Sequence, residues 1–221
     1  MLEAEWAFTS RVDDVCQVVE GAIKRALFQE DTQADFELLW KSRPQEQLDI
    51  LENARTTERW SRMSYSDAIK ELLIVQEASK PFKFSPKWGQ ALQSEHERYI
   101  ADKITGGPTF VTDYPAGLKP FYMRPNEDGK TVACFDLLVP HLGELAGGSL
   151  REERLPYLER AIDNHGLDPA TYDWYLDIRK YGGAPHGGFG LGFERLISWL
   201  TGVENVRECI AMPRWAGRML L

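Results

Sequence analysis

The chain has 221 residues, 43% of them hydrophobic, and a formal net charge of −8 at pH 7. This size and composition are typical of a folded domain with its own core, and no stretch is long and apolar enough to span a bilayer. The negative charge argues against a protein that binds nucleic acid over its whole surface, although it is compatible with a local patch.

The cysteines and the N-terminal residues indicate the cellular compartment in which the protein is expected. Cys16, Cys134 and Cys209 are far apart and odd in number, which fits neither a disulfide framework nor a metal cluster. We therefore expect reduced thiols in an intracellular compartment. The acidic start has no basic region followed by an apolar one, so neither a signal peptide nor a transit peptide is expected.

The first half of the chain is predicted to be helical after one short strand. Residues 2–8 alternate in part between apolar and polar types, which favours a strand, and Asp13 or Asp14 can cap the helix that follows. Apolar spacing, caps and proline positions predict the helices of this half, over residues 15–27, 44–51, 68–75 and 85–101.

The second half changes to extended segments with helices in blocks. The predicted strands cover residues 109–115, 121–123, 131–139 and 143–150, followed by helices over 151–164 and 171–180 and a glycine-rich strand. Strands joined by hairpin-like or meandering links, with the helices in separate blocks, predict an α+β fold with an antiparallel sheet flanked by helices. A Rossmann unit is disfavoured because no early strand leads into a G-x-G-x-x-G turn.

The glycine-rich strand near the C-terminus is the most informative segment. Four of the six residues 187–192 are glycines, and Glu194 and Arg195 follow at the predicted strand-to-helix junction. Glycine weakens a strand and usually marks the close approach of a ligand or of another backbone. Arg195 can then reach a flat, anionic ligand such as a nucleotide. A simple glycine-rich turn before a helix is the alternative.

Three charged residues are further candidates. Asp136 lies inside an otherwise apolar strand and Glu144 opens the next extended segment, so the two carboxylates can hold Mg²⁺ against phosphates. From these residues alone, a turn cap or a lysine pair is a slightly better explanation of Asp136. Arg151 follows Gly147-Gly148-Ser149-Leu150 and can grip a carbonyl or carboxylate, or can belong to a solvated helix face.

No side-chain nucleophile is evident, because the sequence has neither a G-x-S-x-G motif nor a P-loop lysine. Any chemistry would therefore rest on positioning and charge stabilisation.

Several motifs resemble those of class II aminoacyl-tRNA synthetases, and in particular the aspartyl and asparaginyl branch. The glycine strand with Phe193-Glu194-Arg195 resembles motif 3, and residues 1–8 are similar to the second strand of motif 2. Other segments that resemble this branch occur in the same order, at residues 119–124, 147–153, 181–190, 202–210 and 213–214. The resemblance covers essentially the whole chain and is nearest to the bacterial and mitochondrial asparaginyl type.

This resemblance implies a truncated class II catalytic core over residues 1–221. About residues 10–105 would form a helical insert after motif 2, and residues 106–221 the C-terminal sheet with motif 3. The anticodon-binding domain, motif 1 and the first half of motif 2 are expected to be absent, so the chain is interpreted as a fragment of a longer synthetase with little activity alone. A genuine short paralogue is the alternative.

The resemblance also implies the roles of individual residues. ATP binding would fall to Glu144, Gly190, Gly192, Phe193, Glu194 and Arg195. Mg²⁺ would be held by Asp136 and Glu144, with Arg151 and Arg195 as catalytic groups. Arg151 and Glu3 match the pair that binds the amino-acid side chain. Arg151 can donate to the C=O of an asparagine carboxamide and Glu3 can accept from its NH₂, whereas the carboxylate of aspartate would be repelled by Glu3.

The implied function is that of an asparagine–tRNA ligase, which uses ATP and Mg²⁺ to activate asparagine and then charges tRNA. A homodimer is expected for the family, although its motif 1 interface would be missing. The mitochondrial matrix or the cytoplasm is the expected location. The alternatives are an aspartyl-type or non-discriminating synthetase and a non-catalytic protein that binds a nucleotide or a partner.

Overall fold

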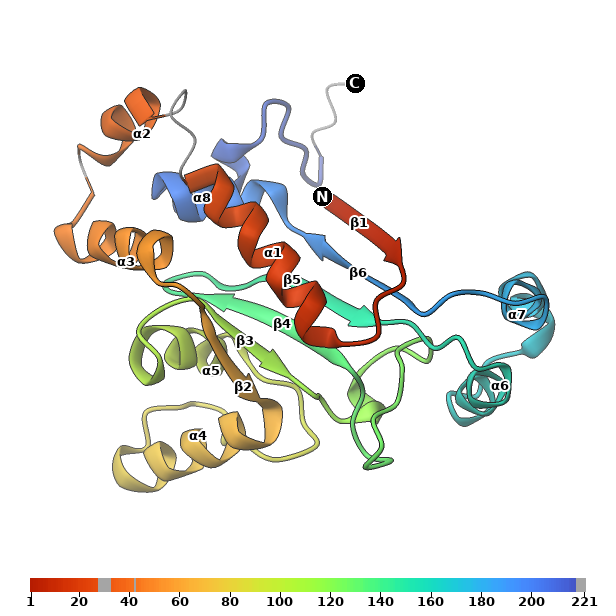
Figure 1. The fold of residues 1–221 in the computed structure, drawn as a ribbon. Coiled ribbons are helices and arrows are strands. Elements are labelled where there is room, and N and C mark those ends of the chain that lie inside the picture. The colour runs from red at the N-terminus through yellow and green to blue at the C-terminus, as the bar shows by residue number, and fades with distance from the viewer. Residues whose placement is uncertain (28–32, 42, 218–221) are drawn as a thin grey trace.

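A six-stranded mixed sheet forms the centre of the computed structural model, which describes residues 1–27, 33–41 and 43–217 (Figure 1). In spatial order the strands are β1 (Leu2–Ala7), β6 (His186–Leu191), β5 (Gly143–Leu150), β4 (Cys134–Val139), β3 (Thr109–Thr112) and β2 (Ser61–Ser64). All neighbouring strands are antiparallel except β2 and β3. The predicted α+β fold is confirmed, with one parallel pair at the edge of the sheet.

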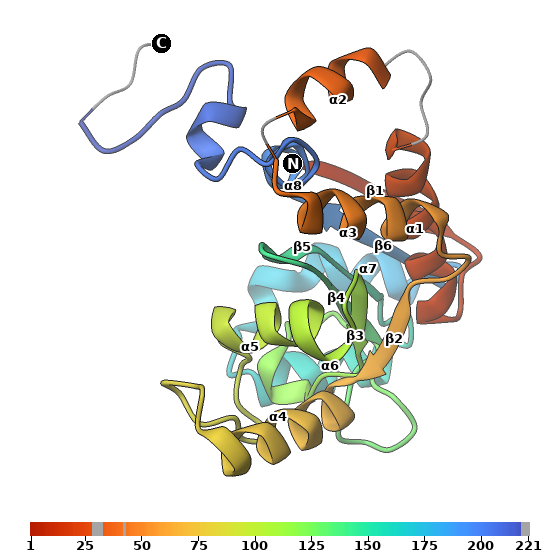
Figure 2. The ribbon, with the colours of Figure 1, turned by 90° about the vertical axis from the view of Figure 1, so that its left-hand side faces the viewer.

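Helices cover both faces of this sheet (Figures 1 and 2). The helices are α1 (Val12–Leu27), α2 (Gln33–Trp40), α3 (Gln45–Thr56), α4 (Tyr65–Ser79), α5 (Ser94–Tyr99), α6 (Leu155–Asn164), α7 (Asp173–Lys180) and α8 (Phe193–Thr201). Short 3₁₀ turns occupy Ala116–Leu118, Pro169–Tyr172 and Val206–Cys209, and a π-helical turn covers Ile100–Ile104. None of the helices in the described ranges is long and apolar enough to cross a membrane.

Two apolar cores lie on opposite faces of the sheet. One packs the sheet against α1, α3 and α8, and the other packs it against α4 and the turn that follows α5. Alternation along β4 sends Phe135 and Leu137 into the first core and Cys134 and Leu138 into the second. Asp136 shares the parity of Cys134 and Leu138, so it lies on the face that carries α4 and α5.

Strand β2 was not predicted and corrects the expectation that the first half of the chain is helical after its one short strand. Its four residues Ser61–Ser64 pair in parallel with β3. Two parallel neighbours need a long crossover connection, which α4 and α5 supply here. Four residues are too few to give a clear periodic signal in the sequence.

The predicted helix over residues 85–101 is wrong in its first half, since α5 begins only at Ser94. The backbone of the preceding segment bonds to side chains instead. The Tyr65 hydroxyl donates to Gln90 O at 2.7 Å and accepts from Gly89 N at 3.0 Å. The Glu95 carboxylate accepts from Phe84 N at 2.8 Å. These long-range partners satisfy the groups that a helix would otherwise use.

Other predicted bounds change as well, since β3 ends at Thr112 rather than at residue 115 and β4 begins at Cys134 rather than at residue 131. Residues 121–123 form no strand, and Met123 makes only an isolated bridge with Arg151. The helix predicted from residue 151 begins at Leu155, because Glu152 N donates to Tyr122 O at 2.8 Å and the chain is still extended there.

Candidate functional site

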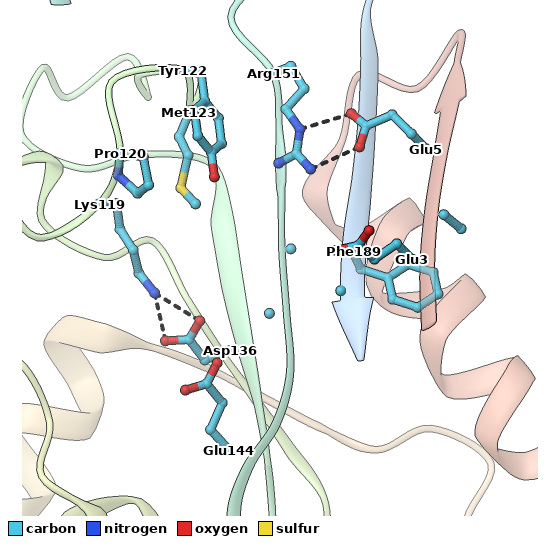
Figure 3. A pocket seen from close by; sticks show the side chains of 14 residues that line it. Glu3, Glu5, Lys119, Pro120, Tyr122, Met123, Asp136, Glu144, Arg151 and Phe189 are labelled. Atoms are coloured by element: carbon cyan, nitrogen blue, oxygen red, sulfur yellow. Dashed lines mark hydrogen bonds and ion pairs between the residues drawn. The ribbon is translucent and has the colours of Figure 1, made fainter. Parts of the chain in front are cut away.

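A hollow of about 610 Å³ opens on the sheet face that carries α4 and α5 (Figure 3). Its floor includes Gly147, Gly148 and Gly190 of the neighbouring strands β5 and β6. Charged side chains stand on its two sides. Arg151 and two glutamates of β1 lie on one side, and Lys119 with Asp136 and Glu144 lies on the other.

The glycines are needed first for close packing within the sheet. A Cβ atom at Gly148 would lie 2.6 Å from the Phe135 ring and 2.7 Å from Gly188 O. A Cβ atom at Gly188 would overlap Ala4 O and the Glu5 carboxylate. The predicted close approach of another backbone is therefore confirmed, and the bare surface of β6 lets the Glu5 side chain lie across it.

Arg151 and Glu5 form a two-pronged ion pair across β6. Arg151 Nε donates to Glu5 Oε1 at 2.8 Å and Nη2 donates to Oε2 at 2.9 Å. Arg151 Nη1 also donates to the Ser149 hydroxyl. A guanidinium has five N–H groups, so these three contacts leave two for a ligand. The paired geometry fixes the plane of the guanidinium.

Glu5 occupies the place next to Arg151 that the family resemblance assigned to Glu3. Alternate residues of a strand point to one face, so both glutamates line the hollow, Glu3 opposite Gly190 and Glu5 opposite Gly188. The alternation alone could not distinguish them, because only the register of β1 on β6 decides which acid reaches Arg151. Glu3 remains a candidate ligand-binding residue on the same wall.

Asp136 is paired with a lysine, which is the plainer alternative that the sequence left open. Lys119 Nζ lies 2.8 Å and 2.7 Å from the two oxygens of Asp136. The ammonium also lies 4.0 Å from the centre of the Tyr114 ring, and Tyr114 hydrogen-bonds to Asp136. Burial, together with the charge of Asp136, raises the pKa of the Tyr114 hydroxyl, so Tyr114 is a proton donor to that carboxylate.

Glu144 lies beside Asp136, as the sequence predicted for a shared site. A Cβ atom at Gly147 would lie 3.3 Å from Asp136 Oδ1 and 3.3 Å from Glu144 Oε1, so the two carboxylates converge over that glycine. Burial raises the pKa of Glu144, and the negative charges of Asp136 and Glu97 raise it further. The charges of Lys119 and Arg195 act in the opposite direction and lower the pKa of Glu144.

Glu97 of α5 is a third acid here and was not predicted. Its Oε2 accepts from Glu144 N at 3.3 Å, and burial raises its pKa. In the sequence it lies in the Glu95-His96-Glu97 run of a polar helix, and nothing local indicates that this helix packs against β5. Within the described parts of the chain, no group of three or more acidic, histidine or cysteine side chains is arranged as a complete metal site.

Arg195 lies behind the acids and does not line the hollow. It sits in the first turn of α8, where Nη2 donates to Leu142 O at 3.4 Å and Nε is buried without a hydrogen-bond partner. Its charge nevertheless lowers the pKa of both Glu97 and Glu144. The missing side chain of Gly192 leaves space for Arg195, whose Cδ lies 3.1 Å from a Cβ built there.

Of the other residues predicted to bind the nucleotide, some line the hollow and some do not. Gly190 lines the hollow, whereas Phe193, 50% exposed, and Glu194 do not. The structure therefore brings Asp136, Glu144 and Arg151 around one hollow and places the motif that contains Arg195 at its rear.

Comparison with known proteins identifies the family. The model of the class II tRNA synthetases (D, K and N) matches residues 1–216, and the chain belongs to this family. An asparagine–tRNA ligase of Desulfotalea psychrophila is 46% identical over 219 residues, which cover 98% of this chain and 48% of that protein. The chain thus spans about half the length of the curated relatives it matches.

Two further relatives agree with this result. The chloroplastic/mitochondrial asparagine–tRNA ligase of Arabidopsis thaliana is 55% identical over 154 residues, which are 69% of this chain and 27% of that protein. The asparaginyl-tRNA synthetase of Pyrococcus horikoshii, solved in complex with asparaginyl-adenylate, superimposes with a TM-score of 0.83 at 32% identity. That match covers 98% of this chain and 47% of the Pyrococcus chain.

Proposed function

We propose that this chain is the catalytic segment of an asparagine–tRNA ligase, which joins asparagine to AMP from ATP and then to tRNA. The observation that carries the proposal is the Arg151–Glu5 pair in the same hollow as Asp136 and Glu144. One wall thus suits a carboxamide and the other suits a metal with phosphates. The relatives named above support asparagine as the amino acid and an adenylate as the intermediate.

The carboxamide would be recognised by its hydrogen-bonding pattern. The two remaining N–H groups of Arg151 can donate to the amide oxygen, and Glu5 or Glu3 can accept from the amide NH₂. The carboxylate of aspartate has no N–H to offer and would face two acids. Charge repulsion then rejects the wrong substrate, as an unpaired like charge does in other specific sites.

The nucleotide end would lie over Asp136 and Glu144. Their converging oxygens are hard ligands of the kind that Mg²⁺ takes, and an incomplete protein site fits a metal that shares its coordination with phosphates. Bound Mg²⁺ would neutralise charge on those phosphates. The bare floor at Gly147 and Gly190 leaves space for the adenylate, and Arg195 adds positive charge behind the acids.

Binding of stable adenylate analogues to the 221-residue chain tests this proposal. Asparaginyl and aspartyl sulfamoyl-adenosine differ only in the group that faces Arg151. We expect calorimetry to give the asparaginyl compound an affinity about 100-fold higher, because the aspartyl compound loses its amide contacts and meets like charge. Equal affinities would contradict asparagine specificity, and binding of neither compound would contradict the function as a whole.

The remaining partners stay proposals of the same kind. We propose tRNA as the acceptor because the relatives are named as asparagine–tRNA ligases. The homodimer remains a prediction from the family resemblance. A mitochondrial or cytoplasmic location also remains a prediction.

A further inference from the structure

Lys119 is the cation held most closely by the acidic wall of the hollow. Both oxygens of Asp136 lie within 2.8 Å of its Nζ, and the Lys119 and Asp136 side chains are only 16% and 15% exposed. The Tyr114 ring supports the ammonium from one side at 4.0 Å. In this arrangement the lysine contacts both oxygens of Asp136 and neutralises the charge of that carboxylate.

A divalent cation would need the same carboxylate. Asp136 and Glu144 converge over Gly147, yet Asp136 has both oxygens on the ammonium. A metal bound to Asp136 would lie close to the ammonium of Lys119, and repulsion between the two positive charges would favour withdrawal of the lysine. With Glu97, the wall has three acids, and the charges of Lys119, Arg195 and Arg98 act on them, so Lys119 is the cation that an arriving metal ion would replace beside Asp136.

The position of Lys119 in the chain allows such an exchange. It follows the short 3₁₀ turn Ala116–Leu118 and begins the 119–123 segment, which lines the hollow. Lysine has a flexible four-carbon stem and a compact charge. Lys119, Tyr122 and Met123 line the same hollow (Figure 3), so rotation of the lysine side chain away from Asp136 would keep the ammonium within it.

We propose that Lys119 is an exchangeable cation of the nucleotide site. It neutralises Asp136 while the site holds no nucleotide, and it moves to a phosphate oxygen when Mg²⁺ arrives with ATP. The proposal rests on the proposed function, since it assigns the phosphates of ATP to this hollow. Its consequence is that metal alone binds weakly and that metal and nucleotide strengthen each other, because the displaced ammonium gains a new partner only when both are present.

Mn²⁺ binding to the nucleotide-free chain tests the first half of the exchange. We expect Lys119→Met to bind Mn²⁺ about tenfold more tightly than the native chain in a paramagnetic resonance titration, since the competing charge is gone. Lys130→Met removes the same charge from an exposed position 11 residues further on and should leave the affinity within about twofold. Equal affinity in Lys119→Met and Lys130→Met would overturn the proposal.

Binding of the Mg²⁺ complex of α,β-methylene-ATP tests the second half. Here the lost phosphate contact opposes the gain at the metal, so we expect the tenfold advantage that Lys119→Met has for Mn²⁺ alone to disappear or reverse. A Lys119→Met chain that keeps its tenfold advantage for the nucleotide complex would overturn the transfer to phosphate. Lys119→Gln, whose side chain is shorter but is polar and carries no charge, replaces Lys119→Met if circular dichroism shows that the latter is unfolded.

The outcome can be separated from that of the proposed function. Asparaginyl sulfamoyl-adenosine has no phosphate, so we expect it to bind native and Lys119→Met chains equally well. If it binds both while Mn²⁺ affinity is unchanged, the exchange is wrong and the function stands. If it binds neither while Lys119→Met still gains Mn²⁺ affinity, the assignment of asparagine is wrong and the displacement of lysine by metal stands.

Discussion

Gly188 determines whether Glu5 can lie across β6 and meet Arg151. The position faces Ala4 O and the Glu5 carboxylate so closely that any Cβ atom must displace one of them. The ion pair at 2.8 Å and 2.9 Å then depends on an absent side chain in the neighbouring strand. Close approach of this kind is a reason for glycine inside a strand.

Gly188→Ala should therefore damage the site and the fold together. We expect a loss of about 1–3 kcal/mol in the free energy of unfolding, because β1 must shift outward. The asparaginyl analogue should bind about tenfold more weakly, since Glu5 moves away from Arg151. Gly183→Ala is the matched control, because its Cβ would meet nothing nearer than Ile178 O at 3.9 Å. Urea unfolding and calorimetry measure both effects, and native behaviour of Gly188→Ala would refute this explanation.

The sequence predicted part of this site for a physical reason. Asp136 and Arg151 are conspicuous because a charge in or beside an apolar strand needs a partner or a ligand. Glu5, Lys119 and Glu97 lack that signal. Glu5 has the same parity as Glu3, Lys119 lies in a loop, and Glu97 belongs to a polar helix. Their roles depend on strand register and on packing between segments far apart in the chain.

At the scale of elements, helix α8 illustrates how the motif that contains Arg195 is anchored. The helix ends at Gly202, whose φ of +82° is in the left-handed region. Arg43 Nη1 donates to Trp199 O at 3.1 Å and to Leu200 O at 2.8 Å, and Trp40 Nε1 donates to Leu200 O at 2.7 Å. Side chains from near α2 thus satisfy the carbonyl groups that a helix end leaves free.

Gly202→Ala should destabilise the chain by about 2 kcal/mol, because alanine is strained at this φ and its Cβ would lie 2.7 Å from Arg43 Nε.

Gly21→Ala should change the free energy of unfolding in the opposite direction. Gly21 lies inside α1, exposed and with no atom within 4 Å of a built Cβ, so alanine should stabilise by about 1 kcal/mol. Chemical unfolding of the two variants checks both signs. A stabilised Gly202→Ala would show that the cap is not strained.

Helices and strands could be predicted where a cap or an apolar pattern within the segment itself indicates them. Ser64 caps α4, with its side chain accepting from Asp67 N at 3.1 Å, and β1, α1 and β4 follow clear apolar patterns. Strand β2 and the extended chain before α5 could not be predicted in this way. Both are held by partners distant in sequence, which are β3 and the Tyr65 hydroxyl.

At the scale of the whole molecule, one sheet separates two cores, and each core contains a buried thiol. Cys16 lies in the core under α1 and Cys134 in the core on the opposite face. Burial raises the pKa of each thiol to about 12. In the unfolded chain thiols titrate near pH 8.5, so between about pH 9 and pH 12 the folded state binds more protons than the unfolded state.

Stability should consequently fall as the pH rises above 9. Each buried thiol contributes a loss of at most about 1.4 kcal/mol per pH unit, because the folded state must keep the proton that the unfolded state releases. We expect the double variant Cys16→Ala/Cys134→Ala, although less stable at pH 8, to lose stability more slowly between pH 9 and pH 11. Urea denaturation across that range measures the two slopes. Identical slopes would mean that the thiols are not buried in the folded state.

Arg151, neutralised by Glu5, should recognise a carboxamide and reject a carboxylate. The decisive measurement is the affinity ratio of asparaginyl to aspartyl sulfamoyl-adenosine, determined for the native chain and for Glu5→Gln. Removal of the Glu5 charge leaves Arg151 free to pair with the aspartyl carboxylate, so we expect the native preference for the asparaginyl compound to fall by about tenfold or more. An unchanged ratio in Glu5→Gln would show that the Arg151–Glu5 pair does not determine this preference.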